Sequence, residues 1–140
     1  MDKKILVLSL ILLSSCNINW NGDIDLGGDF YYLVDPVFNS INVPVNPNKP
    51  YVSSNFVIQN IEQVGFNKKC ILAISDSSNI KMYWMIDKTK KSECLGYNNN
   101  SRMILSNVNK IDSIKFKAMI QQTGVEMKSK TFYRKQLNYE

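Results

Sequence analysis

Three cysteines are the residues whose chemistry this 140-residue sequence specifies most directly. Cys16 ends an apolar N-terminal run, whereas Cys70 and Cys94 lie much further along the chain. The sequence contains no histidine, so it lacks the commonest general base, the commonest metal ligand and every Ser-His or Cys-His nucleophile pair. We therefore expect a non-enzymatic protein with no metal site and no cofactor; a hydrolase that uses carboxylates or Ser-Lys chemistry is a less favoured alternative.

The first fifteen residues are typical of a signal peptide. Lys3 and Lys4 precede an apolar run from Ile5 to Leu13. A membrane-spanning helix needs about 20 apolar residues, so this run is too short to cross a bilayer and has the length of a cleaved leader. We expect residues 1–15 to be removed.

The stretch Leu13-Ser14-Ser15-Cys16 resembles the bacterial lipobox. The resemblance implies that the Cys16 thiol receives a diacylglyceryl group, that a peptidase cuts before it, and that the new amine is acylated, for example with palmitate. Such acyl chains would anchor the protein to a membrane of the cell envelope, the outer membrane in a Gram-negative source. The alternative is an ordinary signal peptide followed by a cysteine.

Composition excludes some partners. Removal of the leader leaves 125 residues with 15 basic and 11 acidic side chains, a net charge of +4. This length suits one domain with a real core. So mild a charge, without basic patches interleaved with aromatic residues, gives no reason to expect nucleic acid as a partner.

Lipidation of Cys16 would leave Cys70 and Cys94 as an even pair. In an oxidising compartment these two could form a disulfide. Cys70 lies in an apolar run, however, where a free cysteine packs as a small core residue. The spacing leaves both alternatives open.

The mature chain divides into three parts. Residues 16–28 are polar and contain glycine, which predicts a tether. Residues 29–120 are predicted to form a single domain. Residues 121–140 are basic and weakly patterned, which indicates an edge strand or a frayed tail.

Apolar runs bounded by turn residues predict most of the strands. The expected strands are 30–34, 56–64, 69–75, 80–87 and 114–120. Those in the middle of the chain should form an antiparallel meander. The prolines of residues 39–50 predict a loop or an edge there, because proline cannot donate a hydrogen bond to a sheet.

One short helix is expected after the meander. Ile104, Val108 and Ile111 are spaced as on one helical face. Apolar residues then alternate with lysines through 114–120, which favours a strand with one wet face. The expected fold class is α+β, a small antiparallel sheet with one short helix packed on it.

Three hydrophobic motifs resemble a family of small, functionally uncharacterised bacterial lipoproteins. They are Gly28-Asp29-Phe30-Tyr31-Tyr32-Leu33, a hairpin from Ile61 to Ala73, and a strand from Tyr83 to Lys88. These motifs describe strands and carry no catalytic residue. The resemblance therefore implies a fold and no activity.

Two further features were weighed as binding or catalytic sites. Asp87 ends an apolar strand, but carboxylate catalysis usually needs a pair, so a role in a turn is favoured. Tyr83 and Trp84 could stack on a ligand, although their strand spacing favours the core. The expected function is a lipid-anchored binding or structural domain; the alternative is an inhibitor or immunity-like protein that captures one protein partner through residues 39–50.

Overall fold

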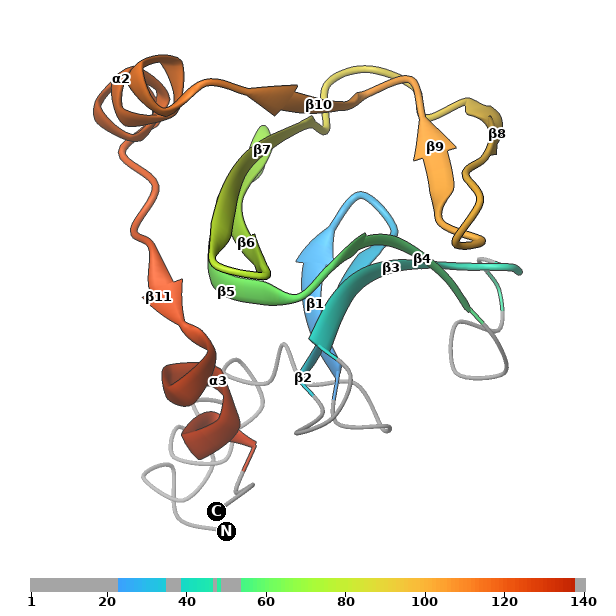
Figure 1. Cartoon of the computed structure of the whole chain (residues 1–140), viewed down its shortest axis with the longest axis horizontal. Helices are drawn as coiled ribbons and strands as arrows, with labels where there is room; N and C mark the ends of the chain where they lie inside the picture. The colour runs from blue at the N-terminus through green and yellow to red at the C-terminus, as the bar shows by residue number, and fades with distance from the viewer. Residues whose placement is uncertain (1–22, 35–38, 47, 49–53, 138–140) are drawn as a thin grey trace, which may run out of the picture.

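Two antiparallel sheets form the body of the computed structural model, which describes residues 23–34, 39–46, 48 and 54–137 (Figure 1). The four-stranded sheet runs, in spatial order, β1 (Asp23–Gly27), β2 (Phe30–Val34), β3 (Asn39–Pro44) and β4 (Ser54–Gln59). The five-stranded sheet runs β10 (Val108–Ile111), β7 (Ile80–Asp87), β6 (Cys70–Ser77), β5 (Ile61–Phe66) and β11 (Lys128–Ser129).

The remaining elements lie around these sheets. A separate hairpin joins β8 (Cys94–Tyr97) to β9 (Met103–Leu105). The helices are α2 (Ser113–Thr123) and α3 (Lys130–Gln136). None of the described helices is long and apolar enough to cross a membrane. The fold is thus rich in antiparallel strands with two short helices, and the expected single small sheet is too simple.

The two sheets are joined by one bent segment. The predicted strand 56–64 is in fact β4 and β5, separated at Asn60, which has φ 57°. Pairing also shifts register between Ile61 and Gln63. Asparagine tolerates this left-handed backbone conformation better than most residues. The chain therefore leaves one sheet at Asn60 and enters the other directly.

Most of the core lies between the sheets. Strand alternation sends one set of side chains inward from the five-stranded sheet, including Ala73, Trp84 and Ile86. These pack with buried residues of the four-stranded sheet such as Phe30 and Tyr32. The prediction that 69–75 and 80–87 are neighbouring strands of a meander is confirmed.

The opposite face of the five-stranded sheet carries a smaller core. Leu72 and Cys70 of β6 pack there with Phe116 of α2 and with Val125. Gly65 of β5 allows the chain after α2 to approach closely, because an added Cβ would lie 2.5 Å from the Glu126 carbonyl oxygen. This segment and α2 cover one part of the outer face.

Two stretches expected to be irregular are strands. Residues 23–27, within the predicted tether, form β1 and bury Ile24 and Leu26. Residues 39–44, expected to be a loop or edge, form β3 in the interior of its sheet. Pro44 is its last residue, so the strand ends where a proline is tolerated. The rest of the 39–50 segment is described only in part.

The predicted helix and the strand after it are both wrong. Residues 104–111 form the end of β9 and β10, and 113–123 form α2. Asp112 caps α2 by accepting a hydrogen bond from the Lys115 amide (2.7 Å), and Gly124 ends it with φ 67°. Ile114 is 81% exposed, so the alternating apolar residues of α2 do not share a buried face.

The C-terminal segment is more ordered than a frayed tail. The edge strand expected there exists as β11, which pairs with β5. It leads into α3, whose Tyr133 is buried in the main core. The Tyr133 hydroxyl donates to the Val64 carbonyl (3.0 Å), which fastens α3 to the five-stranded sheet.

Candidate functional site

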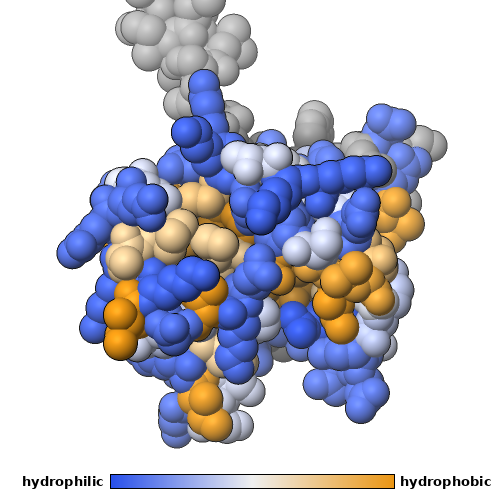
Figure 2. Space-filling model, turned by 90° about the horizontal axis from the view of Figure 1, so that it is seen from above, coloured by the Kyte–Doolittle hydropathy of each residue, from blue (hydrophilic) through white to orange (hydrophobic). Residues whose placement is uncertain are grey.

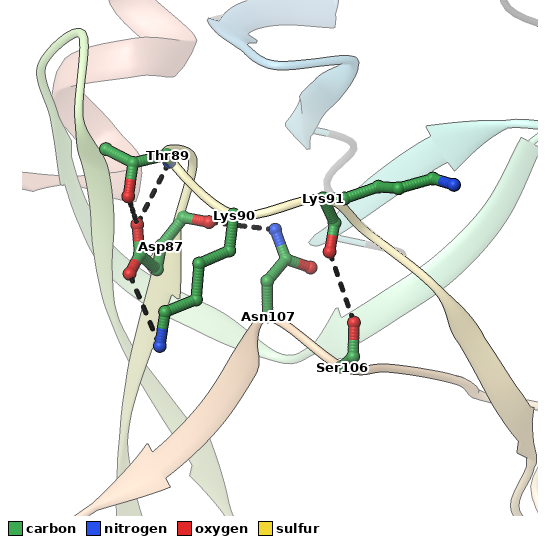
Figure 3. A network of polar contacts seen from close by, with 6 residues as sticks. All are labelled: Asp87, Thr89, Lys90, Lys91, Ser106 and Asn107. Carbon is green, nitrogen blue, oxygen red and sulfur yellow. Dashed lines mark hydrogen bonds and ion pairs between the residues drawn. The ribbon is translucent and has the colours of Figure 1, made fainter.

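Asp87 occupies a turn, as its position at the end of a strand suggested. Its Oδ1 accepts hydrogen bonds from the Thr89 amide (2.9 Å) and the Thr89 hydroxyl (2.5 Å), and Lys90 lies 3.9 Å from the other oxygen (Figure 3). The Thr89 hydroxyl bond is the main reason why the pKa of Asp87 is lowered. The carboxylate is therefore a turn cap, and it stays ionised.

Asn107 holds the same loop from the other side. It is buried, and its Nδ2 donates to the Asp87 carbonyl (3.0 Å) while its Oδ1 accepts from the Ser92 hydroxyl (2.9 Å). Ser106 beside it donates to the Lys91 carbonyl (3.3 Å; Figure 3). These bonds satisfy buried polar groups and fix the loop after β7, so we assign the network a structural role.

Trp84 is a core residue and offers no open stacking surface. It is 8% exposed, and its indole N–H donates to the Ser75 hydroxyl (2.9 Å). The Arg102 guanidinium covers the ring at 5.2 Å from its centroid. Tyr83 points to the opposite face and packs against Phe116 of α2 (5.1 Å between centroids). Both rings are used in packing.

Cys70 and Cys94 are both free cysteines in the structure. Cys70 is buried in β6, and Cys94 is exposed on β8. Burial is the main cause of the raised pKa of Cys70, so its thiol stays protonated near neutral pH and is a poor nucleophile. Cys16 lies outside the described residues. No group of three or more metal-ligating side chains (Cys, Asp, Glu) occurs within the described part of the chain.

A pocket that the sequence did not reveal lies beside Lys88. This open cavity of about 540 Å³ is lined by residues 25–28 of the β1–β2 turn, by residues 66–68 of the β5–β6 turn, and by Lys88. Its volume falls in the range of ligand-binding pockets. The pocket lies between the two sheets, because the β1–β2 turn belongs to one sheet and the β5–β6 turn to the other.

Lys88 crosses between the two sheets. Its ammonium donates to the Leu26 carbonyl (2.6 Å) and lies 5.8 Å from the centroid of the Phe66 ring. Its backbone amide donates to the Lys69 carbonyl (2.8 Å), which holds the lysine at the base of the β5–β6 turn. The side chain is thus fixed at both ends.

The β1–β2 turn is shaped around this lysine. Gly27 and Gly28 have φ values of 80° and 63°, which glycine adopts readily. An added Cβ would lie 2.9 Å from the Lys88 Nζ at Gly27 and 3.1 Å from its Cδ at Gly28. Both glycines are therefore needed for the backbone conformation, and a side chain at either position would displace Lys88.

The charge of Lys88 is incompletely compensated. Among the described residues, no carboxylate oxygen lies within 4.0 Å of its Nζ. Burial is the main cause of its lowered pKa, and attraction to Cys70 and to Asp25 opposes the shift. Asp25 already accepts a hydrogen bond from the Gly27 amide (2.8 Å). A partly buried cation without a close counter-ion is well placed to attract an anion.

Comparison with protein family models, with curated proteins and with solved structures found no match. The candidate site therefore depends on geometry alone. The sequence indicated Lys88 only as the charged end of a strand. The pair Gly27-Gly28 was a usable signal, but it was interpreted as part of the tether because its partner lies about 60 residues away in the chain.

Proposed function

We propose that this protein is a lipid-anchored component of the cell envelope whose domain binds a ligand and does not catalyse a reaction. The lipobox-like residues Leu13 to Cys16 support the anchor. The observation that carries the binding role is the Lys88 pocket, in which a partly buried cation lacks a close carboxylate among the described residues. Its lining offers charge and an aromatic ring, which suit the binding of a ligand.

Metabolic labelling with a palmitate analogue tests the anchor. The wild-type chain should become labelled and be processed to a shorter form, whereas Cys16→Ala should remain unlabelled and unprocessed. Cys94→Ala is the matched control, because it removes an exposed cysteine far along the chain. Normal labelling of Cys16→Ala would exclude the lipobox interpretation.

Capture of a protein partner is the second candidate, now on a different surface. Residues 39–44 of the predicted binding segment 39–50 form an internal strand, and positions 47, 49 and 50 lie outside the described residues. Leu95 and Tyr97 of β8 are instead 66% and 56% exposed. Figure 2 shows hydrophobic patches over β8–β9 and over α2, with hydrophilic side chains between them. Exposed apolar groups of this kind mark interaction surfaces when they are contiguous.

The charge of the same region favours an acidic partner. Residues 90–117 contain six basic and two acidic side chains, a net charge of +4. Binding of an acidic protein there should weaken in Leu95→Ser. Ile80→Ser is the matched control, because Ile80 is also 66% exposed but lies at the β6–β7 turn. Equal effects of the two substitutions would exclude β8 as the binding surface.

A further inference from the structure

We propose that the Lys88 pocket binds an organic carboxylate whose apolar or aromatic body packs on Phe66. This inference rests on the proposed binding function and names its ligand class. It draws on three observations: the free hydrogen-bonding capacity of the ammonium, the basic and polar side chains around it, and the aromatic ring beside it.

The ammonium has capacity for a ligand. A lysine ammonium has three N–H donors, and the Leu26 carbonyl is its only hydrogen-bond acceptor among the described residues. Because Lys88 is held at Leu26 and beside Phe66, its remaining donors are fixed in position before a ligand arrives. A cation that is already positioned loses little side-chain entropy on binding.

The surroundings favour an anion. Lys68 lines the same pocket and is exposed, so its ammonium can reach a ligand at the mouth. Asn67 also lines it, although the Asn67 side chain is partly used in capping its own turn through the Lys69 and Cys70 amides. Asp25 is the single acidic residue of the lining. Two lysines against one aspartate give the pocket a positive balance.

The Phe66 ring selects the rest of the ligand. It is half-buried and contributes an apolar wall beside the ammonium. An apolar or aromatic group on the ligand could cover this ring, while its carboxylate meets Lys88. A small inorganic anion would leave the ring bare, so an organic body should improve binding.

Amide chemical shifts of the full chain can test this with three probes. Benzoate has the proposed anion and ring, inorganic phosphate has only the anion, and benzylammonium has only the ring with the opposite charge. Benzoate should move the Gly27, Gly28 and Asn67 amide signals in a saturable way. Phosphate should bind several-fold more weakly, and benzylammonium should leave these signals unchanged.

Variants separate the ammonium from the fold. Lys88→Met should weaken benzoate binding by about tenfold or more, as expected for loss of a charge-assisted hydrogen bond. Because this change also removes the bond to Leu26, Lys68→Glu provides a second test that leaves that bond in place. Lys68→Glu should weaken benzoate several-fold, whereas Lys115→Glu on the exposed surface of α2 should have little effect.

The ring has its own variant. Phe66→Leu keeps an apolar side chain and should weaken benzoate but leave phosphate unchanged. Absence of benzoate shifts at these amides, or equal shifts with benzylammonium, would overturn the proposal. Equal binding of phosphate and benzoate would overturn the role assigned to Phe66. None of these results depends on Cys16, so failure of the pocket and failure of the anchor can be told apart.

Discussion

The two faces of the five-stranded sheet are covered in different ways. The inner face meets a whole second sheet, and Ile71, Ile86 and Val64 on it are fully buried. Among the described residues, α2 and the segment after it pack on the outer face, and Tyr83, Met85 and Ile111 there are half-buried. The inner face thus carries most of the stability, and the outer face depends on one helix being kept in place.

The largest effect is expected on the inner face. Trp84→Ala should lower the free energy of unfolding by about 3–5 kcal/mol, because it leaves a large cavity and an unpaired Ser75 hydroxyl. Urea denaturation measures this change. The control is Tyr97→Ala, which removes an exposed aromatic ring and should change stability by less than about 0.5 kcal/mol. Similar losses in the two variants would contradict the core position of Trp84.

The outer face should respond less. Phe116→Ala removes the single buried side chain of α2 and its contact with Tyr83. We expect a loss of about 3 kcal/mol, at the lower end for such substitutions, because a surface helix can shift to fill part of the cavity. Ile114→Ala on the same helix should be nearly neutral, since that side chain is exposed. A loss larger than that of Trp84→Ala would reverse the ranking of the two faces.

The closure of the inner core by α3 can be tested through pH. Burial is the main cause that raises the pKa of Tyr133 to about 12 from its usual 10.0. The folded state therefore holds this proton more tightly than the unfolded state, so its stabilising contribution is complete below pH 10 and is lost as pH rises towards 12.

Tyr133→Phe should therefore cost about 1 kcal/mol at neutral pH, through loss of the bond to Val64, and should flatten the alkaline loss of stability. Burial also raises the pKa of Tyr32, so part of the alkaline loss should remain. Urea titrations between pH 7 and pH 12 measure both effects. An unchanged alkaline slope would show that the Tyr133 hydroxyl is not buried.

The smallest effect is expected at the start of α2. Asp112→Ala removes the cap on the Lys115 amide and should lower stability by about 0.5–1 kcal/mol. Asp112→Asn keeps a capping oxygen and should be close to wild type. Hydrogen exchange of the first turn of α2 should quicken in the alanine variant alone. Exchange that quickens equally in both variants would mean that the charge of Asp112 matters and its hydrogen bond does not.

The same two faces explain how far the sequence could predict the fold. Strand β6 was predicted because its apolar residues run continuously, and β7 because its side chains alternate between two faces; both are local patterns. The prediction of a strand at 114–120 failed because its alternating apolar residues outweighed Asp112 and Gly124, the capping signals at either end of α2. β1 was missed because the polar and apolar residues of Asp23-Ile24-Asp25-Leu26 alternate over only four positions. Polar residues and glycines flank this stretch, so it resembles a linker.

The Lys88 pocket could not be predicted from the sequence for another reason. Lys88 meets Leu26 across a separation of 62 residues, and that meeting depends on how the two sheets are joined at Asn60. No local pattern contains such information. The absence of histidine, by contrast, is a property of the chain itself, and it limited the chemistry before any fold was considered.

The start of β1 at Asp23 sets the length of the linker that would connect a lipid on Cys16 to the domain. Position 23 lies seven residues after position 16. A fully extended chain spans at most about 3.6 Å per residue. The backbone at the start of β1 could therefore lie no more than about 25 Å from the backbone of an acylated Cys16. An anchored domain of this kind would search a thin layer next to the bilayer, and partners or ligands would have to come to that layer to be captured.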